Sequence, residues 1–193
     1  ANGGAAEVRK RNALTTDMTT SKLLQKLDAG RADDVLVRLQ ELSEELPRHD
    51  QELLLFKACR VNSLPLVRLL LTRAPELLEA RDVRGNTPFL AAVGANHLRV
   101  ARFLRTLGAV PDAVNFQNET VLHLLAGNAV AAKWREPVGE LCAGLAAAHK
   151  INAKSVEGET ALHVACRCEN ELMVDLLVRA NANFSDTNDD GLT

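Results

Sequence analysis

One local pattern recurs along this chain at nearly constant spacing, and it limits the folds that the chain can adopt. The copies of the pattern begin at Thr87, Thr120, Thr160 and Thr193. The successive separations are 33, 40 and 33 residues. Two degenerate copies precede them, one beginning at Leu53 and a weaker one over 22–42. Such a period is typical of proteins in which one small structural unit is stacked many times.

The copy that begins at Thr87 indicates how one unit folds. The Thr87 hydroxyl can cap a short helix that starts at Pro88, where a missing N–H costs nothing. Apolar residues at helical spacing then predict a second helix over 98–107, ended by Gly108. The polar, turn-rich segment 111–119 leads to the next threonine. Two short helices cannot bury their apolar faces alone, so we expect the units to stack into an all-α solenoid.

Residues 87–92 (TPFLAA) and 160–165 (TALHVA) carry the clearest copies of a known motif. The pattern resembles the ankyrin repeat, a helix-turn-helix unit of about 33 residues with the motif T-P-L-H-x-A. The resemblance covers residues 21–193 and implies an ankyrin-repeat solenoid with β-hairpin finger loops. The expected units are a degenerate cap at 22–52, then 53–86, 87–119, 120–159 and 160–192. Residues 1–20 are expected to form a flexible tail, and we expect further repeats or domains after Thr193.

The copy that begins at Thr120 carries seven extra residues. They are expected to enlarge the turn between its two helices, the second of which is predicted over 137–149 with Val138, Leu141 and Leu145 buried. The turn contains Trp134, the single tryptophan of the chain. A large aromatic residue on a turn is either a binding anchor or a side chain that folds back onto its own helix pair. Both readings stay open on the sequence alone.

Candidate chemical groups favour structural roles. The resemblance implies that His123 and His163, at the fourth position of the motif, bond to the threonine and nearby backbone. His163, Cys166 and Cys168 could suggest a metal site, but four ligands are usual and no matching pair is evident. We expect Cys166 to fill the same small buried slot as Cys59. The chain has no GxSxG, GxxxxGK[ST] or HExxH motif, so we expect no enzyme activity, no cofactor and no metal.

Composition narrows the class of partner. The net charge of −2 is too balanced for a chain that coats nucleic-acid phosphates, so no direct nucleic-acid binding is expected. Apolar runs are too short for a membrane span, and no secretion signal is visible. Four cysteines in a leucine-rich chain favour a reducing compartment, the cytoplasm or the nucleus. Residues 51–115 carry a charge of +4 and residues 116–193 a charge of −5, which could steer a partner.

The expected function is protein–protein interaction through a concave face made of fingers and first helices, by an adaptor or regulatory scaffold. The partner would be another protein or an extended peptide, as the family resemblance implies. The array also loosely resembles inhibitors of Rel-type transcription factors, with no specific motif to single them out. The alternative is a targeting or substrate-recruiting domain of a larger enzyme, channel or pathogen effector. The candidate protein-binding residues are Arg81, Arg84, Val114, Phe116, Gln117, Asn128, Trp134, Lys154, Val156, Arg167 and Asp189.

Overall fold

The structure, a computed structural model, describes residues 20–41, 46–129, 134–147 and 149–193. All regular elements in these ranges are helices, as expected for an all-α repeat protein. The chain divides into two compact units, one up to Leu77 and one from Leu78. Except for Thr20, the predicted tail at 1–20 lies outside the described residues. The division into five repeat units stays a prediction.

The first unit contains the degenerate copies. Its helices cover residues 20–28, α2 (Ala32–Glu41), α3 (Arg48–Arg60) and α4 (Leu64–Arg73), and the short 3-10 helix η1 (Pro75–Glu79) begins at its end. α4 packs against both α2 and α3. Leu54, Ala58 and Cys59 on α3 are fully buried, which confirms the small buried slot for Cys59. The copy at Leu53 therefore keeps the helix pair although it has lost the threonine motif.

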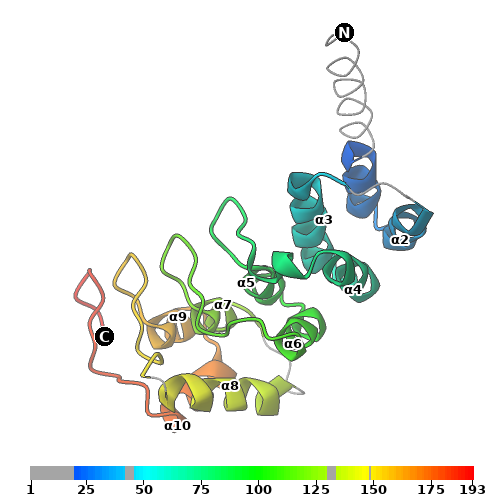
Figure 1. The fold of residues 1–193 in the computed structure, drawn as a ribbon. Helices are drawn as coiled ribbons and strands as arrows, with labels where there is room; N and C mark the ends of the chain where they lie inside the picture. The colour runs from blue at the N-terminus through cyan, green and yellow to red at the C-terminus, as the bar shows by residue number, and fades with distance from the viewer. Residues whose placement is uncertain (1–19, 42–45, 130–133, 148) are drawn as a thin grey trace. The chain divides into compact units, whose positions relative to one another are not determined.

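The second unit contains three helix pairs. Their bounds are α5 (Pro88–Gly94) with α6 (Leu98–Thr106), α7 (Val121–Ala126) with α8 (Arg135–Ala147), and α9 (Ala161–Arg167) with α10 (Glu171–Arg179). The inner helices α5, α7 and α9 pack side by side. Within this unit the fingers extend on one side of the inner helices, and α6, α8 and α10 lie on the other side (Figure 1). The second helix of the Thr87 copy ends one residue before the predicted boundary.

Small residues let the inner helices approach each other closely. Ala92, Ala126 and Ala165 are completely buried, together with Leu122 and Leu125 of the central helix. An inner helix of six or seven residues is too short to be stable in water by itself. Its stability therefore comes from the neighbouring helices on which it packs.

Threonine and histidine side chains fix the start of each inner helix. The Thr87 hydroxyl accepts a hydrogen bond from the Leu90 N–H (3.3 Å), as predicted. In the next copy the Thr120 N–H and hydroxyl both donate to His123 Nδ1, at 3.2 and 2.8 Å. The ring proton is therefore on Nε2, which donates to the Glu159 carbonyl (2.9 Å). This last bond joins the helix to the following finger.

The last described repeat uses the same arrangement. The Thr160 N–H and hydroxyl contact His163 Nδ1 at 3.2 and 2.8 Å, and His163 Nε2 lies 3.1 Å from the Leu192 carbonyl. The local bond between histidine and threonine is thus present in both copies, as the resemblance implied. The sequence does not predict the bond from each ring to the next finger, because its acceptor lies 36 residues further along the chain for His123 and 29 for His163.

Two details of the predicted helices are wrong. Helix α8 covers Arg135–Ala147, two residues earlier than predicted at each end. Val138 and Leu145 are buried as predicted, but Cys142 is buried in place of Leu141. Cys166 is exposed, because in the described residues α9 packs against an inner helix on one side only, α7. The position equivalent to that of Cys59 is therefore not buried by a further inner helix among the described residues.

His123 makes the stability of the fold depend on pH. Burial lowers the pKa of His123 below its ordinary value of 6.5, so the folded protein resists protonation of a ring that the unfolded chain protonates freely. The free energy of unfolding should therefore fall as pH decreases below about 6.5. His123→Gln should cost roughly 1–2 kcal/mol at pH 7.5. Urea denaturation should show that the free energy of unfolding falls less between pH 7.5 and pH 5.5 in the variant than in the wild type. An equal fall in both proteins would contradict this role of His123.

The four thiols should differ in reactivity. Burial raises the pKa of Cys59 to about 12 and that of Cys142 to about 11, so both stay protonated inside the fold. Cys166 and Cys168 are exposed. Ellman's reagent should therefore react quickly with two thiols of the native protein and with all four in denaturant. In Cys166→Ser the fast phase should drop to one thiol, and a fast phase of any other size would contradict the packing described here.

Candidate protein-binding face

Four finger tips project from the second unit, and one local turn builds each of them. We define the finger tips as residues 82–86, 115–119, 155–159 and 188–192. In each tip the first residue donates its N–H to the carbonyl of the fifth, at 2.8–3.2 Å. The side chain of this first residue accepts hydrogen bonds from N–H groups of the same tip. The four first residues are Asp82, Asn115, Ser155 and Asn188. Short oxygen-bearing side chains at this position stabilise the turn.

The fourth residue of each tip has a left-handed backbone. These residues are Gly85, Asn118, Gly158 and Gly191, with φ between 56° and 76°. Glycine and asparagine adopt this conformation at low cost. All four tips therefore have the same backbone conformation at this position.

Backbone hydrogen bonds connect neighbouring tips in a fixed register. The second residue of a tip donates its N–H to the third residue of the preceding tip. The bonds join Phe116 N to Arg84 O (3.0 Å), Val156 N to Gln117 O (2.9 Å) and Asp189 N to Glu157 O (3.4 Å). The four tips therefore form one continuous row.

In the first three tips the second residue is apolar and exposed. Val83, Phe116 and Val156 have 92%, 69% and 66% of their surface exposed. The Phe116 ring also lies against Gly85, where an added Cβ would come within 2.6 Å of the ring. Phe116 thus packs on the adjacent finger and still presents most of its surface to solvent.

A groove of about 520 Å³ runs beside the row of tips, between the fingers and the inner helices. It brings together five predicted residues: Phe116, Gln117, Asn128, Val156 and Arg167. Sequence reasoning missed Glu119, Glu157 and Glu159, which line the same groove. Arg167 Nη2 pairs with Glu159 Oε2 at 2.9 Å. The groove therefore contains more carboxylates than cations.

Three predicted residues use their side chains in hydrogen bonds to backbone carbonyls that connect neighbouring repeats. Arg81 donates to the carbonyls of Gly85 and Val114, and Lys154 Nζ donates to the Thr187 carbonyl (2.8 Å). The Asn128 amide donates to the Val93 carbonyl (3.0 Å). These side chains tie one repeat to the next.

The remaining candidates lie outside the groove. Arg84 and Asp189 are exposed on the first and last tips, and Val114 is half-buried at the base of its finger. Trp134 lines a different cavity, against the preceding helix pair. No group of three or more metal-ligating side chains is found in the described parts of the chain, and none of the described helices has the length and apolar character needed to cross a membrane.

Comparison with known proteins agrees with this architecture. The ankyrin repeat family matches residues 84–116 and 157–189. The chain is an ankyrin-repeat protein. It is 30% identical over 150 residues to NF-kappa-B inhibitor delta of Mus musculus, covering 77% of this chain and 44% of that protein. It is also 34% identical over 110 residues to an ankyrin repeat protein of Fowlpox virus (strain NVSL), covering 56% of this chain and 30% of that protein. The chain thus spans less than half the length of either relative.

The contact between Phe116 and Gly85 can be measured with a double-mutant cycle. Gly85→Ala introduces a Cβ at φ +76° that also meets the Phe116 ring, whereas Gly191→Ala has nearly the same φ, +75°, and nothing within 4 Å. Backbone strain should cost each variant about 1 kcal/mol, and Gly85→Ala should lose more because of the ring. Chemical denaturation should show that this excess disappears in a Phe116→Ala background. An excess that persists without the ring would contradict the contact.

Proposed function

We propose that the protein binds another protein through the row of finger tips and the groove beside it, as an adaptor or regulatory scaffold. The observation that carries the proposal is the row of apolar side chains from Val83, Phe116 and Val156, held in register by backbone bonds and open to solvent. Exposed apolar side chains in a regular row, next to a groove, are typical of interaction sites. An extended segment of a partner could contact all three.

The third residues of the tips favour one orientation of the bound segment. They are Arg84, Gln117, Glu157 and Asp190 in chain order, so their charge changes from positive through neutral to negative. The groove carboxylates Glu119 and Glu157 add to the negative end. A partner segment would place acidic residues near the first tip and basic residues near the last two. Such complementarity fixes register and speeds association more than it adds affinity.

The name of one relative supports a regulatory role. One is named as an inhibitor of NF-kappa-B, and inhibition by a protein built from repeats is naturally achieved by binding. We further propose the cytoplasm or the nucleus as the compartment. All four cysteines are free thiols, as is usual where thiols are kept reduced.

The proposal predicts which surface substitutions abolish partner capture. Phe116→Ala combined with Val156→Ala should remove proteins that the wild-type chain retains from a native lysate, because both anchors leave the row. Each anchor is expected to contribute about 1–2 kcal/mol, so the retained amount should fall at least about tenfold. Quantitative mass spectrometry of the retained proteins measures this.

Val178→Ala is the matched control, since Val178 is an exposed apolar residue on α10, away from the fingers. It should leave the retained proteins unchanged. Arg84→Glu should reduce the rate of association in biolayer interferometry with the captured partner, more at low salt than at high salt. Equal retention by the tip variant and the wild type would show that the finger row is not the binding face.

A further inference from the structure

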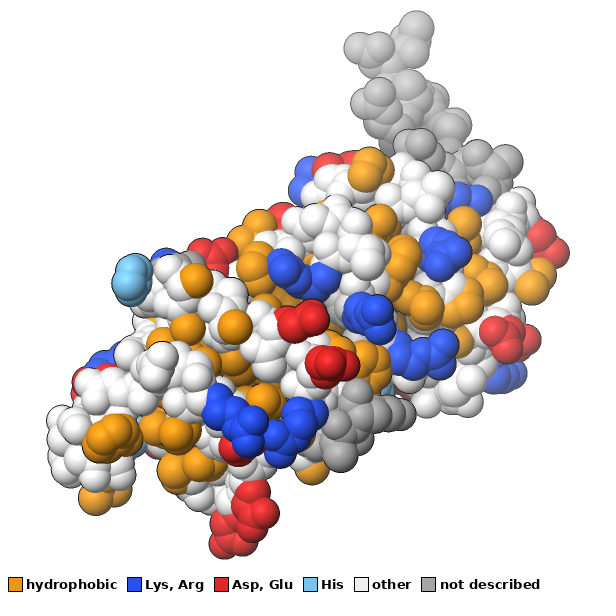
Figure 2. Space-filling model, turned by 90° about the horizontal axis from the view of Figure 1, so that it is seen from below, with side chains coloured by type: hydrophobic (Ala, Val, Ile, Leu, Met, Phe, Trp, Pro, Cys, Tyr) orange, Lys and Arg blue, Asp and Glu red, His pale blue; other side chains and the backbone are white. Residues whose placement is uncertain are grey.

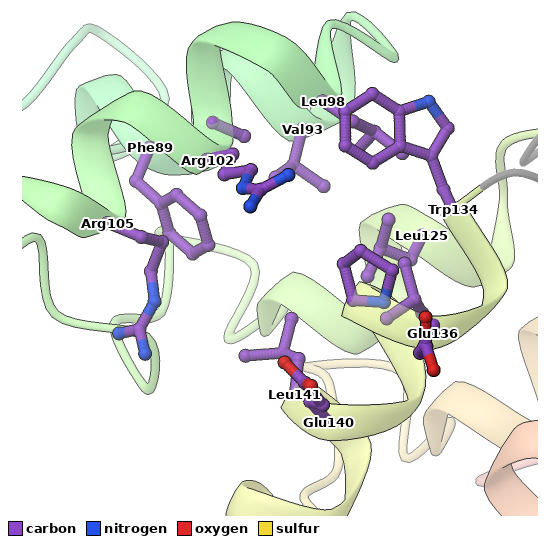
Figure 3. Close-up of a pocket in the computed structure, with 13 residues that line it drawn as sticks. Phe89, Val93, Leu98, Arg102, Arg105, Leu125, Trp134, Glu136, Glu140 and Leu141 are labelled. Carbon is purple, nitrogen blue, oxygen red and sulfur yellow. The ribbon is translucent and has the colours of Figure 1, made fainter.

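A second open groove lies between the helix pair α5–α6 and helix α8. Its volume is about 430 Å³. Figure 3 shows side chains from both sides converging on it, with Trp134 at one end and Arg102 extending into the space. It shares no lining residue with the groove beside the fingers. It is therefore a separate surface of the second unit.

The inserted residues account for this opening. Three residues connect α5 to α6 (95–97) and α9 to α10 (168–170), whereas eight connect α7 to α8 (127–134). Helix α8 has 13 residues, compared with nine in α6 and α10. It packs against α10, and Arg135 Nη1 pairs with Asp175 Oδ2 of α10 at 2.5 Å. Helix α8 thus packs closely against α10 on one side, and a groove remains between α8 and α6 on the other.

The groove has an apolar floor between two charged walls. Arg102 and Arg105 line the α6 wall, three residues apart, and Glu136 and Glu140 line the α8 wall, four residues apart. On this face of the molecule, positive and negative side chains lie close to exposed apolar ones (Figure 2). The floor and ends are formed by Phe89, Val93, Leu98, Ala101, Leu125, Trp134, Pro137, Val138 and Leu141.

The charges on these walls are available to a partner. Arg102 and both glutamates pair with no charged side chain in the described part of the chain. Arg105 donates only to a backbone carbonyl, that of Ala109 (3.0 Å), which leaves its charge uncompensated. Trp134 is half-buried, so part of its side chain remains accessible to a partner. Aromatic residues and arginine are enriched at the centre of protein interfaces, and other charged residues are found at the rim.

We propose that this groove binds an amphipathic α-helix of a partner protein. The helix would lay an apolar stripe on the floor, place acidic residues along Arg102 and Arg105, and place basic residues along Glu136 and Glu140. The wall charges repeat at intervals of one helical turn, which matches the spacing of charges along the flanks of a bound helix. A small polar ligand would leave most of the apolar floor uncovered.

Trp134 provides a local reporter, because the chain has no other tryptophan. The probe is a stapled helical peptide of about 14 residues without tryptophan, with leucine along one face, glutamate on one flank and lysine on the other. Its addition to the whole chain should shift Trp134 emission to shorter wavelength in a saturable manner. A peptide with serine in place of leucine should cause no shift.

Charge-reversal variants test the walls. Arg102→Glu and Glu140→Lys should each weaken peptide binding roughly fivefold to tenfold. Arg99→Glu is the matched control, because Arg99 is exposed on the same helix but does not line the groove. It should change the affinity less than about twofold. Circular dichroism should show unchanged helix content in all three, since the substituted side chains are exposed.

Three results would overturn the proposal. The first is no saturable shift of the emission, and the second is equal binding of the leucine and serine peptides. The third is a shift that appears without peptide as protein concentration rises, which would identify a second copy of the chain as the occupant. The Phe116→Ala, Val156→Ala variant should bind the peptide like the wild type. Loss of finger-dependent capture and loss of peptide binding are therefore separate outcomes.

Discussion

The contact between α5, α7 and α9 is the interaction on which the second unit depends. These helices have only six or seven residues each, and an isolated helix of that length does not persist in water. Fully buried alanines such as Ala92, Ala126 and Ala165 allow them to pack closely enough to stabilise one another. The finger tips extend from the ends of these helices, so their register also depends on this packing. The proposed binding face is therefore a property of neighbouring repeats together, and no single repeat contains it.

The sequence predicts the local structure of each repeat well because the signals are local. A threonine that can cap a helix, a proline after it and a left-handed residue at the turn lie within a few positions of one another. Burial depends on neighbours about 33 residues away, so it is harder to predict. Cys59 and Cys166 occupy similar positions in their repeats, but only Cys59 is buried, because α9 has an inner helix on one side only in the described residues. The position of a residue in its repeat determines which way its side chain points. The neighbouring repeat determines how much of that side chain is exposed.

The same distinction applies to three of the candidate site residues, whose place in the repeat follows from the sequence but whose hydrogen bonds do not. Arg81, Asn128 and Lys154 do lie on or near the fingers, as their place in the repeat indicates. Their polar groups nevertheless donate to backbone carbonyls of adjacent repeats, which no pattern within one repeat reveals. Phe116 and Val156 remain open to solvent because they follow the turn-forming residue of each tip. Their exposure at a structurally fixed position is the reason that the proposed binding face rests on them.

The seven extra residues of the Thr120 copy change one side of the second unit and leave the other side intact. Phe116 N and Arg84 O are 32 positions apart in sequence and 3.0 Å apart in space. Val156 N and Gln117 O are 39 positions apart, across the insertion, and 2.9 Å apart. The tip-to-tip bond is therefore the same with and without the insertion. The added length is taken up where α7 connects to α8, on the side of the second open groove. Because the finger row is unaffected, the two surfaces can differ in shape without compromising each other, which is the condition for the two binding sites proposed here to act independently.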